Sequence, residues 1–468
     1  MLFNSYEFIF FFLPFTFFVY FYLNKKHLTE ASKGFLVLAS LFFYAWWNIL
    51  YLPLILLSMS VNYTLGRQMS LKKYKAKILL IMGISFNLLL LGYFKYMDFF
   101  ILNTNRVLHT EIPLMDLALP LAISFYTFQQ IAYLVDSYRN ETKEYDFLNY
   151  AVFVTFFPQL IAGPIVHHSE MMPQFARLKN KVKNYYNIAL GLFIFSIGLF
   201  KKVIIADTFA QWAMQGFDVA EKLNMLEAWV SSLSYTFQLY FDFSGYTDMA
   251  IGIALLFNIK LPMNFFSPYK ARNIQDFWRR WHITLSRFLK DYIYIPLGGN
   301  RKSSIRTYSN LFMTFVLGGI WHGAGWTFVF WGMLHGGALV LHRLWSKLGF
   351  KMYGFIAWFI TFNFINIAWI FFRANDFASA LKVLKAMFLG EWIIPVSFTL
   401  GEWSKLFQSE SYVFFWILGA FVLVLVLPNS MQLKDKFKPS AFFMMFTLGA
   451  FLSIFMLYRK SEFLYFNF

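Results

Sequence analysis

The hydrophobic residues of this chain are gathered into long apolar runs, and most charged residues lie between them. A helix that spans a bilayer needs about 20 consecutive apolar residues. Runs long enough to enter or span a bilayer lie near residues 7–23, 34–66, 78–102, 117–135, 147–166, 185–205, 226–258, 308–342, 354–372, 411–427 and 440–458. The pattern predicts an all-α integral membrane protein with about 11 transmembrane segments, built as a single domain over residues 1–468.

The run at residues 34–66 predicts a helical hairpin. It would form roughly 50 Å of helix, against a hydrocarbon core of about 30 Å. Lysines and arginines flank both of its ends, so the positive-inside rule places both ends in the cytoplasm. The run then crosses an even number of times, and we expect the turn near Trp46, Trp47 and Asn48.

The run at residues 308–342 predicts a second hairpin, because basic residues flank it on both sides. Its centre reads HGAGW, and glycines favour a turn there. His322 therefore lies at the turn, roughly 20 Å of helix from the basic loop. An ionisable side chain at such depth is functional by default, and the alternative is a neutral histidine bonded to a neighbouring helix. For His335 and His342, further along the run, we expect bonds across helices.

The run at residues 147–166 ends in FFPQLIAGPIV, where Pro158, Gly163 and Pro164 interrupt any helix. Irregular backbone at membrane depth is tolerated only where protein or a wet cavity covers it. We therefore predict a re-entrant segment here.

The segment from Lys260 to Arg306 holds ten basic and two acidic residues, which places it on the cytoplasmic side. Within it, apolar residues from Phe277 to Tyr292 recur at helical spacing. This periodicity predicts an amphipathic helix that lies in the membrane interface and carries His282. Its basic residues are Arg279, Arg280, Arg287 and Lys290.

Composition narrows the class of protein. Hydrophobic residues make up 59% of the chain and charged residues only 14%, against about a quarter charged in soluble domains. A net charge of +17 would suit a nucleic-acid binder, but the basic residues cluster in the loops, so we predict no nucleic-acid partner. The chain has no cysteine, which excludes disulfides, thiolate nucleophiles and cysteine metal sites.

The chain closes with an aromatic segment, residues 459–468, that contains one tyrosine, Tyr465. Lys434, Lys436 and Lys438 place the preceding loop inside, so the last span leaves this segment on the extracytoplasmic side. Aromatic side chains are unfavourable in water, and we expect the segment to dock in a cavity. A disordered hydrophobic tail is the alternative.

Other polar residues are weaker candidates for chemistry. Asp242 and Asp248 lie in the apolar YFDFSGYTDM, where Asp242, Ser244 and Gly245 are interpreted as a helix cap and bend more readily than as a polar site. The adjacent His167 and His168 lack a companion carboxylate at zinc spacing, so we predict no metal site.

Several motifs together resemble the membrane-bound O-acyltransferase (MBOAT) superfamily, in its bacterial alginate and peptidoglycan O-acetylation branch. The likeness covers nearly the whole chain. It is carried by MLFNSYEFIF at the start, ISFYTFQQIAYLVD, FFPQLIAGPIV, YFDFSGYTDMAIG, QDFWRRWHITLSRFLKDYIYIPLGGNR, GGIWHGAGW and the closing FLYFNF.

The resemblance implies a helical funnel or tunnel in the bacterial inner membrane, with His322 as the catalytic histidine and His282 as the second family position. It also implies acyl transfer, most simply of acetyl from cytoplasmic acetyl-CoA, toward an extracytoplasmic esterase-like partner of the SGNH type. That partner would place the acetyl group on a polysaccharide hydroxyl. Tyr465 matches a tyrosine thought to carry the acyl group in related D-alanylation systems.

Chemistry at these residues is consistent with that role. A phenol ionises near pH 10 and a free histidine near 6.5, so His322 can act as general base toward Tyr465, with His282 positioning the thioester or its oxyanion. Cationic side chains pair with phosphates, or equally with anionic lipid headgroups. The predicted donor-binding residues are Arg279, Arg280, Arg287, Lys290, Trp278 and Trp321.

Three alternatives remain open at this stage. The first is D-alanyl transfer to teichoic acid, which would use a separate carrier protein. The second is a transporter or channel in which histidines relay protons. The third is a scaffold that only recruits the extracytoplasmic partner.

Overall fold

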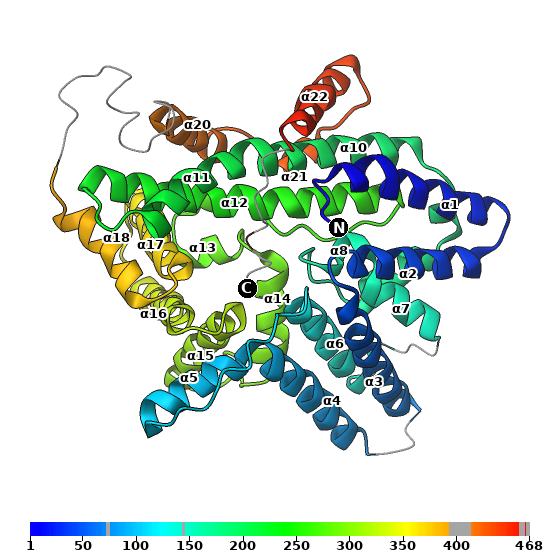
Figure 1. Cartoon of the computed structure of the whole chain (residues 1–468), viewed down its shortest axis with the longest axis horizontal. Helices are drawn as coiled ribbons and strands as arrows, with labels where there is room; N and C mark the ends of the chain where they lie inside the picture. The colour runs from blue at the N-terminus through cyan, green and yellow to red at the C-terminus, as the bar shows by residue number, and fades with distance from the viewer. Residues whose placement is uncertain (72–74, 143–145, 393–412, 458–463, 465–468) are drawn as a thin grey trace. The chain divides into compact units, whose positions relative to one another are not determined.

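The computed structural model describes the chain except residues 72–74, 143–145, 393–412, 458–463 and 465–468. Within these described residues the chain forms helices joined by turns and contains no strand (Figure 1). Its backbone contacts divide it into two compact units. The first unit comprises residues 1–199, 246–263 and 437–457, and the second comprises residues 200–245, 264–436 and 458–468.

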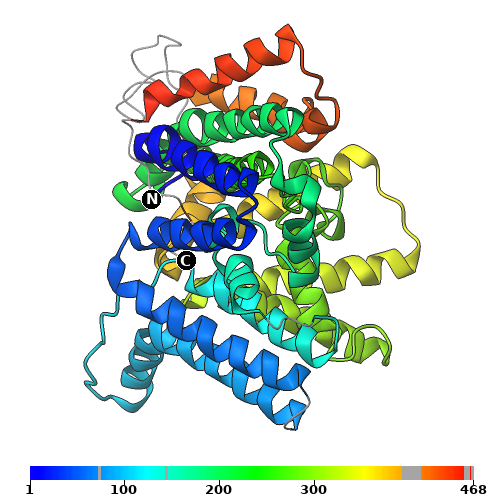
Figure 2. The same cartoon turned by 90° about the vertical axis from the view of Figure 1, so that its right-hand side faces the viewer.

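The first unit opens with two antiparallel helices, α1 and α2, which lie side by side (Figures 1 and 2). Between α2 and α3, the Asn48 side chain accepts a hydrogen bond from Leu50 N at 2.9 Å, so the turn predicted near Trp46 is confirmed. The even number of crossings expected for this run stays a prediction. The elements are η1 (Glu7–Phe12), α1 (Leu13–Lys25), α2 (Thr29–Ala45), η2 (Ile49–Tyr51), α3 (Leu52–Ser70), α4 (Ala76–Leu91), η3 (Gly92–Tyr96), α5 (Met97–Leu108), α6 (Ile123–Tyr138), α7 (Phe147–Thr155), α8 (Phe157–Leu160), α9 (His168–Ala176), η4 (Leu178–Lys181), α10 (Tyr185–Phe200), α22 (Ala441–Phe451) and η9 (Leu452–Met456).

The second unit contains the HGAGW hairpin. Its helices pack closely where Gly319 faces Gly332, because a Cβ on Gly332 would meet Phe315 O and Val316 Cα. The elements are η5 (Lys201–Ala206), α11 (Asp207–Met214), η6 (Gln215–Val219), α12 (Met225–Leu256, whose last part belongs to the first unit), η7 (Pro268–Lys270), α13 (Ile274–Trp278), α14 (Ile283–Leu289), η8 (Lys290–Tyr294), α15 (Ser304–His322), α16 (Trp326–Leu348), α17 (Gly354–Arg373), α18 (Phe377–Leu389), α20 (Val413–Leu425) and α21 (Ser430–Asp435).

The helix break predicted within the run at residues 147–166 is confirmed. Helix α7 ends at Thr155, the four-residue α8 follows Phe156, and non-helical backbone runs through Gly163 to His167. Residues 150–166 are buried throughout, so protein covers this irregular backbone. Its depth in a membrane stays a prediction.

Two local predictions are wrong. The amphipathic helix expected from Phe277 to Tyr292 is broken, because Arg279 to His282 separate α13 from α14 and His282 has left-handed backbone angles (φ 43°). Its apolar residues are core residues of the second unit: Phe277, Trp278 and Trp281 are all buried. Asp242, Ser244 and Gly245 form no cap or bend, since they lie within the continuous helix α12.

Membrane-spanning helices are present by length and composition. Among the described residues, five helical segments are long and apolar enough to cross a bilayer, at Glu7–Lys25, Ile49–Ser70, Ala76–Leu108, Tyr185–Val219 and Gly354–Arg373. The larger number of crossings expected from the sequence stays a prediction.

Candidate active site

His322 is the last residue of α15, and the start of α16 folds back beside it. The extended backbone of Gly323 to Gly325 makes the turn, and a Cβ at Gly323 would collide with the Phe328 ring. The φ at position 323 is extended, and any residue can adopt it. The glycine is needed there only because a side chain would have no space. The imidazole is 4% exposed, and its centroid lies 5.1 Å from those of Trp331 and Phe372.

A second buried imidazole, His335, lies one helical turn beyond Trp331 on α16. Its ring centroid is 4.6 Å from that of Trp331, so both histidines contact the same indole. Trp278 at the end of α13 donates its Nε1–H to His335 Nδ1 at 3.2 Å. The bond across helices expected for His335 is therefore present.

The hydrogen bond from Trp278 fixes the protonation of His335. An indole nitrogen can only donate, so Nδ1 must be unprotonated and the neutral ring carries its hydrogen on Nε2. His335 is fully buried, and its Nε2 makes no hydrogen bond to the part of the chain that the structure describes. The ring thus presents a single N–H donor beside Trp331.

His282 is held by Asn264. Thr284 donates its backbone N–H and its hydroxyl to Asn264 Oδ1, at 3.2 and 2.9 Å, and His282 Nδ1 lies 3.1 Å from the same oxygen. Nδ1 therefore carries the hydrogen, and Nε2 is the acceptor. The ring is fully buried against Phe243, and burial lowers the pKa of His282 from 6.5 to about 3. It is a neutral imidazole at physiological pH.

The two predicted histidines are linked through tryptophan rings. Trp281, next to His282 in the chain, lies 5.0 Å from Trp369 between ring centroids. Trp369 in turn stacks on Trp331 at 5.7 Å, and Trp331 contacts His322. The second unit thus brings both histidines to one aromatic core, although they touch different rings.

A basic cavity of about 880 Å³ reaches this core from one side. Its lining includes six basic side chains and no carboxylate: Arg279, Lys290, Arg301, Lys302, His342 and Arg343. Gly298 and Gly299, with φ of 109° and 53°, form a turn that also lines it. Trp278 belongs to the lining as well, and it contacts His335 and Trp331. The arrangement can hold a polyanionic ligand next to the aromatic core.

Only part of the predicted donor-binding set lines this cavity. Arg280 does not, and its Nε pairs instead with Asp276 Oδ1 at 2.8 Å. Arg287 is also outside the lining, while Trp321 contacts His322, with 4.9 Å between ring centroids. The basic side chains Arg301, Lys302 and Arg343 were missed, because the loop and helix end that supply them are separated in sequence.

His322 does not line the cavity. Trp278 is part of the lining, and the Trp331 ring, 5.8 Å from the Trp278 ring, contacts His322. The funnel or tunnel that the family resemblance implies stays a prediction. Tyr465, the predicted acyl acceptor, lies outside the described residues.

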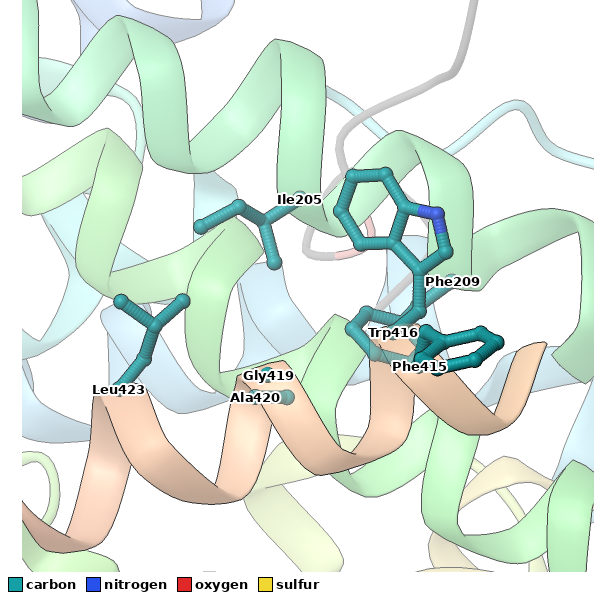
Figure 3. A pocket seen from close by; sticks show the side chains of 7 residues that line it. All are labelled: Ile205, Phe209, Phe415, Trp416, Gly419, Ala420 and Leu423. Carbon is teal, nitrogen blue, oxygen red and sulfur yellow. The ribbon is translucent and has the colours of Figure 1, made fainter. Parts of the chain in front are cut away.

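A second hollow in the same unit carries no chemistry. Figure 3 shows an apolar groove lined by Ile205 and Phe209 and by five residues of α20: Phe415, Trp416, Gly419, Ala420 and Leu423. No ionisable side chain lines it, so it cannot supply an acid, a base or a charged contact.

The sequence reasoning also missed a buried ion cluster in the second unit. Lys202 Nζ lies 2.7 Å from Asp242 Oδ1 and 2.9 Å from Asp207 Oδ1. A lysine inside the apolar run at residues 185–205 was a signal that could have found it, since charges in such runs need partners.

Sequence comparison decides the family. The model of the MBOAT, membrane-bound O-acyltransferase family, matches residues 31–380. The chain belongs to this family. It is therefore a membrane-bound O-acyltransferase, and both the family and the all-helical membrane fold predicted from the sequence are confirmed.

The relatives of this O-acyltransferase act on polysaccharides. It is 57% identical over 420 residues to a peptidoglycan O-acetyltransferase of Helicobacter pylori, covering 83% of this chain and 80% of the relative. It is 40% identical over 402 residues to a probable alginate O-acetylase of Pseudomonas aeruginosa, covering 84% and 76%. A teichoic acid D-alanyltransferase of Streptococcus thermophilus is 26% identical over 287 residues, covering 55% and 69%. Acyl transfer to a polysaccharide is thus the activity that the comparisons support, and the predicted O-acetyltransferase class is confirmed.

Proposed function

We propose that this O-acyltransferase binds acetyl-CoA in the basic cavity and passes its acetyl group by way of His322 to Tyr465. The observation that carries the proposal is the path of contacts from the cavity to His322. Trp278 lines the cavity and contacts Trp331, and Trp331 contacts His322. The phosphates of coenzyme A suit a lining of basic side chains without a carboxylate.

The chemistry requires one proton transfer and one exchange of acyl bonds. His322 takes the proton of the Tyr465 hydroxyl as that oxygen attacks the thioester carbonyl. The carbon–sulfur bond breaks as the phenyl ester forms, and the imidazolium returns the proton to the departing thiolate. His335 Nε2–H is the group of the same core that can donate to the carbonyl oxygen. The one N–H of His282 already donates to Asn264, so His282 acts, in this proposal, by positioning the acyl donor and not by donating to that oxygen.

Access to His322 then depends on Trp278. The indole lines the cavity and is held by its bond to His335. His322 is outside the lining, so in this proposal the Trp278 side chain moves to admit the thioester.

The acetyl group continues, in this proposal, to an extracytoplasmic SGNH-type partner in the envelope of a bacterium, with this protein in the inner membrane. The peptidoglycan O-acetyltransferase at 57% identity supports peptidoglycan as the final acceptor over an alginate-like glycan. D-alanyl transfer to teichoic acid is the second candidate, and the 26% identical D-alanyltransferase supports it more weakly.

Intact-mass analysis tests the relay. Purified protein incubated with acetyl-CoA should gain one acetyl group, located on Tyr465 by peptide mapping. His322→Ala should lower the rate of labelling by about 10² to 10⁴-fold, the usual contribution of a general base. His27→Asn, at an exposed histidine of the first unit, is the matched control and should label like the parent.

The alternatives predict other results. An acetyl group that forms on another residue would contradict the role of Tyr465. Unchanged labelling in His322→Ala would contradict the role of His322, and a transporter or a scaffold would show no thioester-dependent labelling in either form. D-alanyl transfer predicts labelling by a D-alanyl thioester carrier and none by acetyl-CoA.

A further inference from the structure

Asp242, within α12, is hydrogen-bonded to the C-terminal segment. The backbone N–H of Leu464 donates to Asp242 Oδ2 at 3.0 Å. Leu464 is half-buried, and it directly precedes Tyr465 in the sequence. Leu464 is therefore held against the middle of helix α12, although it lies 222 positions further along the chain than Asp242.

The acceptor carboxylate is part of the ion cluster described above. Asp242, Lys202 and Asp207 are 1%, 3% and 5% exposed. Burying a carboxylate is costly unless it is paired and hydrogen-bonded. Lys202 contacts Oδ1 of Asp242, and Oδ2 accepts from the Leu464 N–H.

We propose that Asp242 is the docking residue for the C-terminal segment at Leu464, and that Lys202 orients the Asp242 carboxylate. A carboxylate that accepts from a backbone N–H makes a strong, charge-assisted bond. Because the donor is the backbone, docking at this point does not depend on the side chain of residue 464. Asp207 contacts the same lysine and thereby belongs to the cluster.

The inference extends the proposed function, since docking would fix the residue next to Tyr465 before each transfer. It can be measured without any acyl donor. The chain has no cysteine, so a single Leu464→Cys substitution gives one labelling site and keeps the backbone N–H. The rate at which a maleimide labels this cysteine in the detergent-purified, full-length protein reports how often the segment is released.

Asp242→Ala in this background should raise the labelling rate by about tenfold or more, because it removes the acceptor. Asp242→Asn keeps an acceptor oxygen but no charge, and should give an intermediate rate. Asp218→Ala is the matched control: it removes another carboxylate of the second unit, one that pairs with Arg373, and should stay within about threefold of the parent. Equal rates in all four proteins, or the same increase in Asp218→Ala and Asp242→Ala, would overturn the proposal.

Hydrogen exchange of the unmodified protein gives a second measurement that needs no Asp242 variant to fold. The Leu464 amide should exchange at least about tenfold more slowly than the same amide in a free peptide of residues 459–468. Exchange at the free-peptide rate would refute docking. Neither readout requires acetylation, so the two proposals can fail separately. A docked segment without acetyl-tyrosine would contradict the relay alone. Acetyl-tyrosine without protection of the Leu464 amide from exchange would contradict docking alone.

Discussion

Trp278 donates its indole N–H to His335 Nδ1 at 3.2 Å, and this bond joins the wall of the basic cavity to the aromatic core around His322. One partner ends the short helix α13 and the other lies within α16. The bond both holds the indole in the wall of the cavity and selects the Nε2–H tautomer of His335. In the proposed function, it connects the donor-binding cavity with the reacting histidine.

Trp278→Phe should destabilise the protein by about 1–3 kcal/mol, because it leaves the buried His335 Nδ1 without its donor. Thermal or denaturant unfolding in detergent measures this. Trp345→Phe, at a partly exposed indole on the same helix as His335, should change the free energy of unfolding by less than about 0.5 kcal/mol. The double variant with His335→Phe should be less destabilised than the sum of the single variants, and strict additivity would argue against the bond.

Arg279→Gln should raise the KM for acetyl-CoA by up to about fivefold and leave kcat unchanged, since an exposed ion pair contributes about 0.2–1 kcal/mol. The increase should shrink as salt is added. Its neighbour Arg280 gives the control, because it is paired with Asp276 and does not line the cavity. Steady-state kinetics measures both variants. An equal rise in KM for Arg280→Gln and Arg279→Gln would show that the donor does not bind in this cavity.

Gly332→Ala should destabilise the α15–α16 hairpin by about 1–3 kcal/mol, because its Cβ would meet the backbone of Phe315 and Val316. Gly337→Ala, on the same helix, meets no atom within 4 Å and should stabilise by up to about 1 kcal/mol through helix propensity. The unfolding midpoints of the two variants should therefore move in opposite directions. A shift of the same sign in both would show that the helices do not pack at Gly332.

Stability should fall in acid partly because of His282, which lies outside the five candidate spans. Burial lowers its pKa to about 3, whereas an unfolded histidine titrates near 6.5. Below about pH 6.5 the unfolded chain binds a proton that the folded chain does not. The contribution of His282 to the free energy of unfolding is therefore complete above that pH. It falls by about 1.4 kcal/mol per pH unit as the pH falls toward 3.

His282→Gln should make the dependence of the unfolding midpoint on pH shallower between pH 6.5 and 4, because glutamine does not titrate. The amide can still donate to Asn264 Oδ1. His27→Asn is the control with an exposed histidine and should keep the parent slope. An identical slope in His282→Gln and the parent would show that the ring is protonated in the folded protein.

Local sequence patterns predicted the elements that local interactions specify. The two hairpins were predicted because turn residues interrupt apolar runs that are too long for one helix, and α2–α3 and α15–α16 turn where expected. The prediction of an interfacial amphipathic helix was wrong, because the same apolar spacing also fits short helices buried in the core. The bonds of Asn264 to His282 and Thr284 fix the break between these helices inside the second unit.

The sequence by itself determined the membrane class, the turns within two long apolar runs and the place of His322 at one of them, because hydropathy, glycine and charge act over a few neighbouring residues. The tertiary structure decided which side chains meet: Trp278 with His335, Lys202 with Asp242, and the basic residues around one cavity. Those contacts join residues dozens of positions apart. Helix packing alone sets their distances, and no periodicity along the chain encodes them.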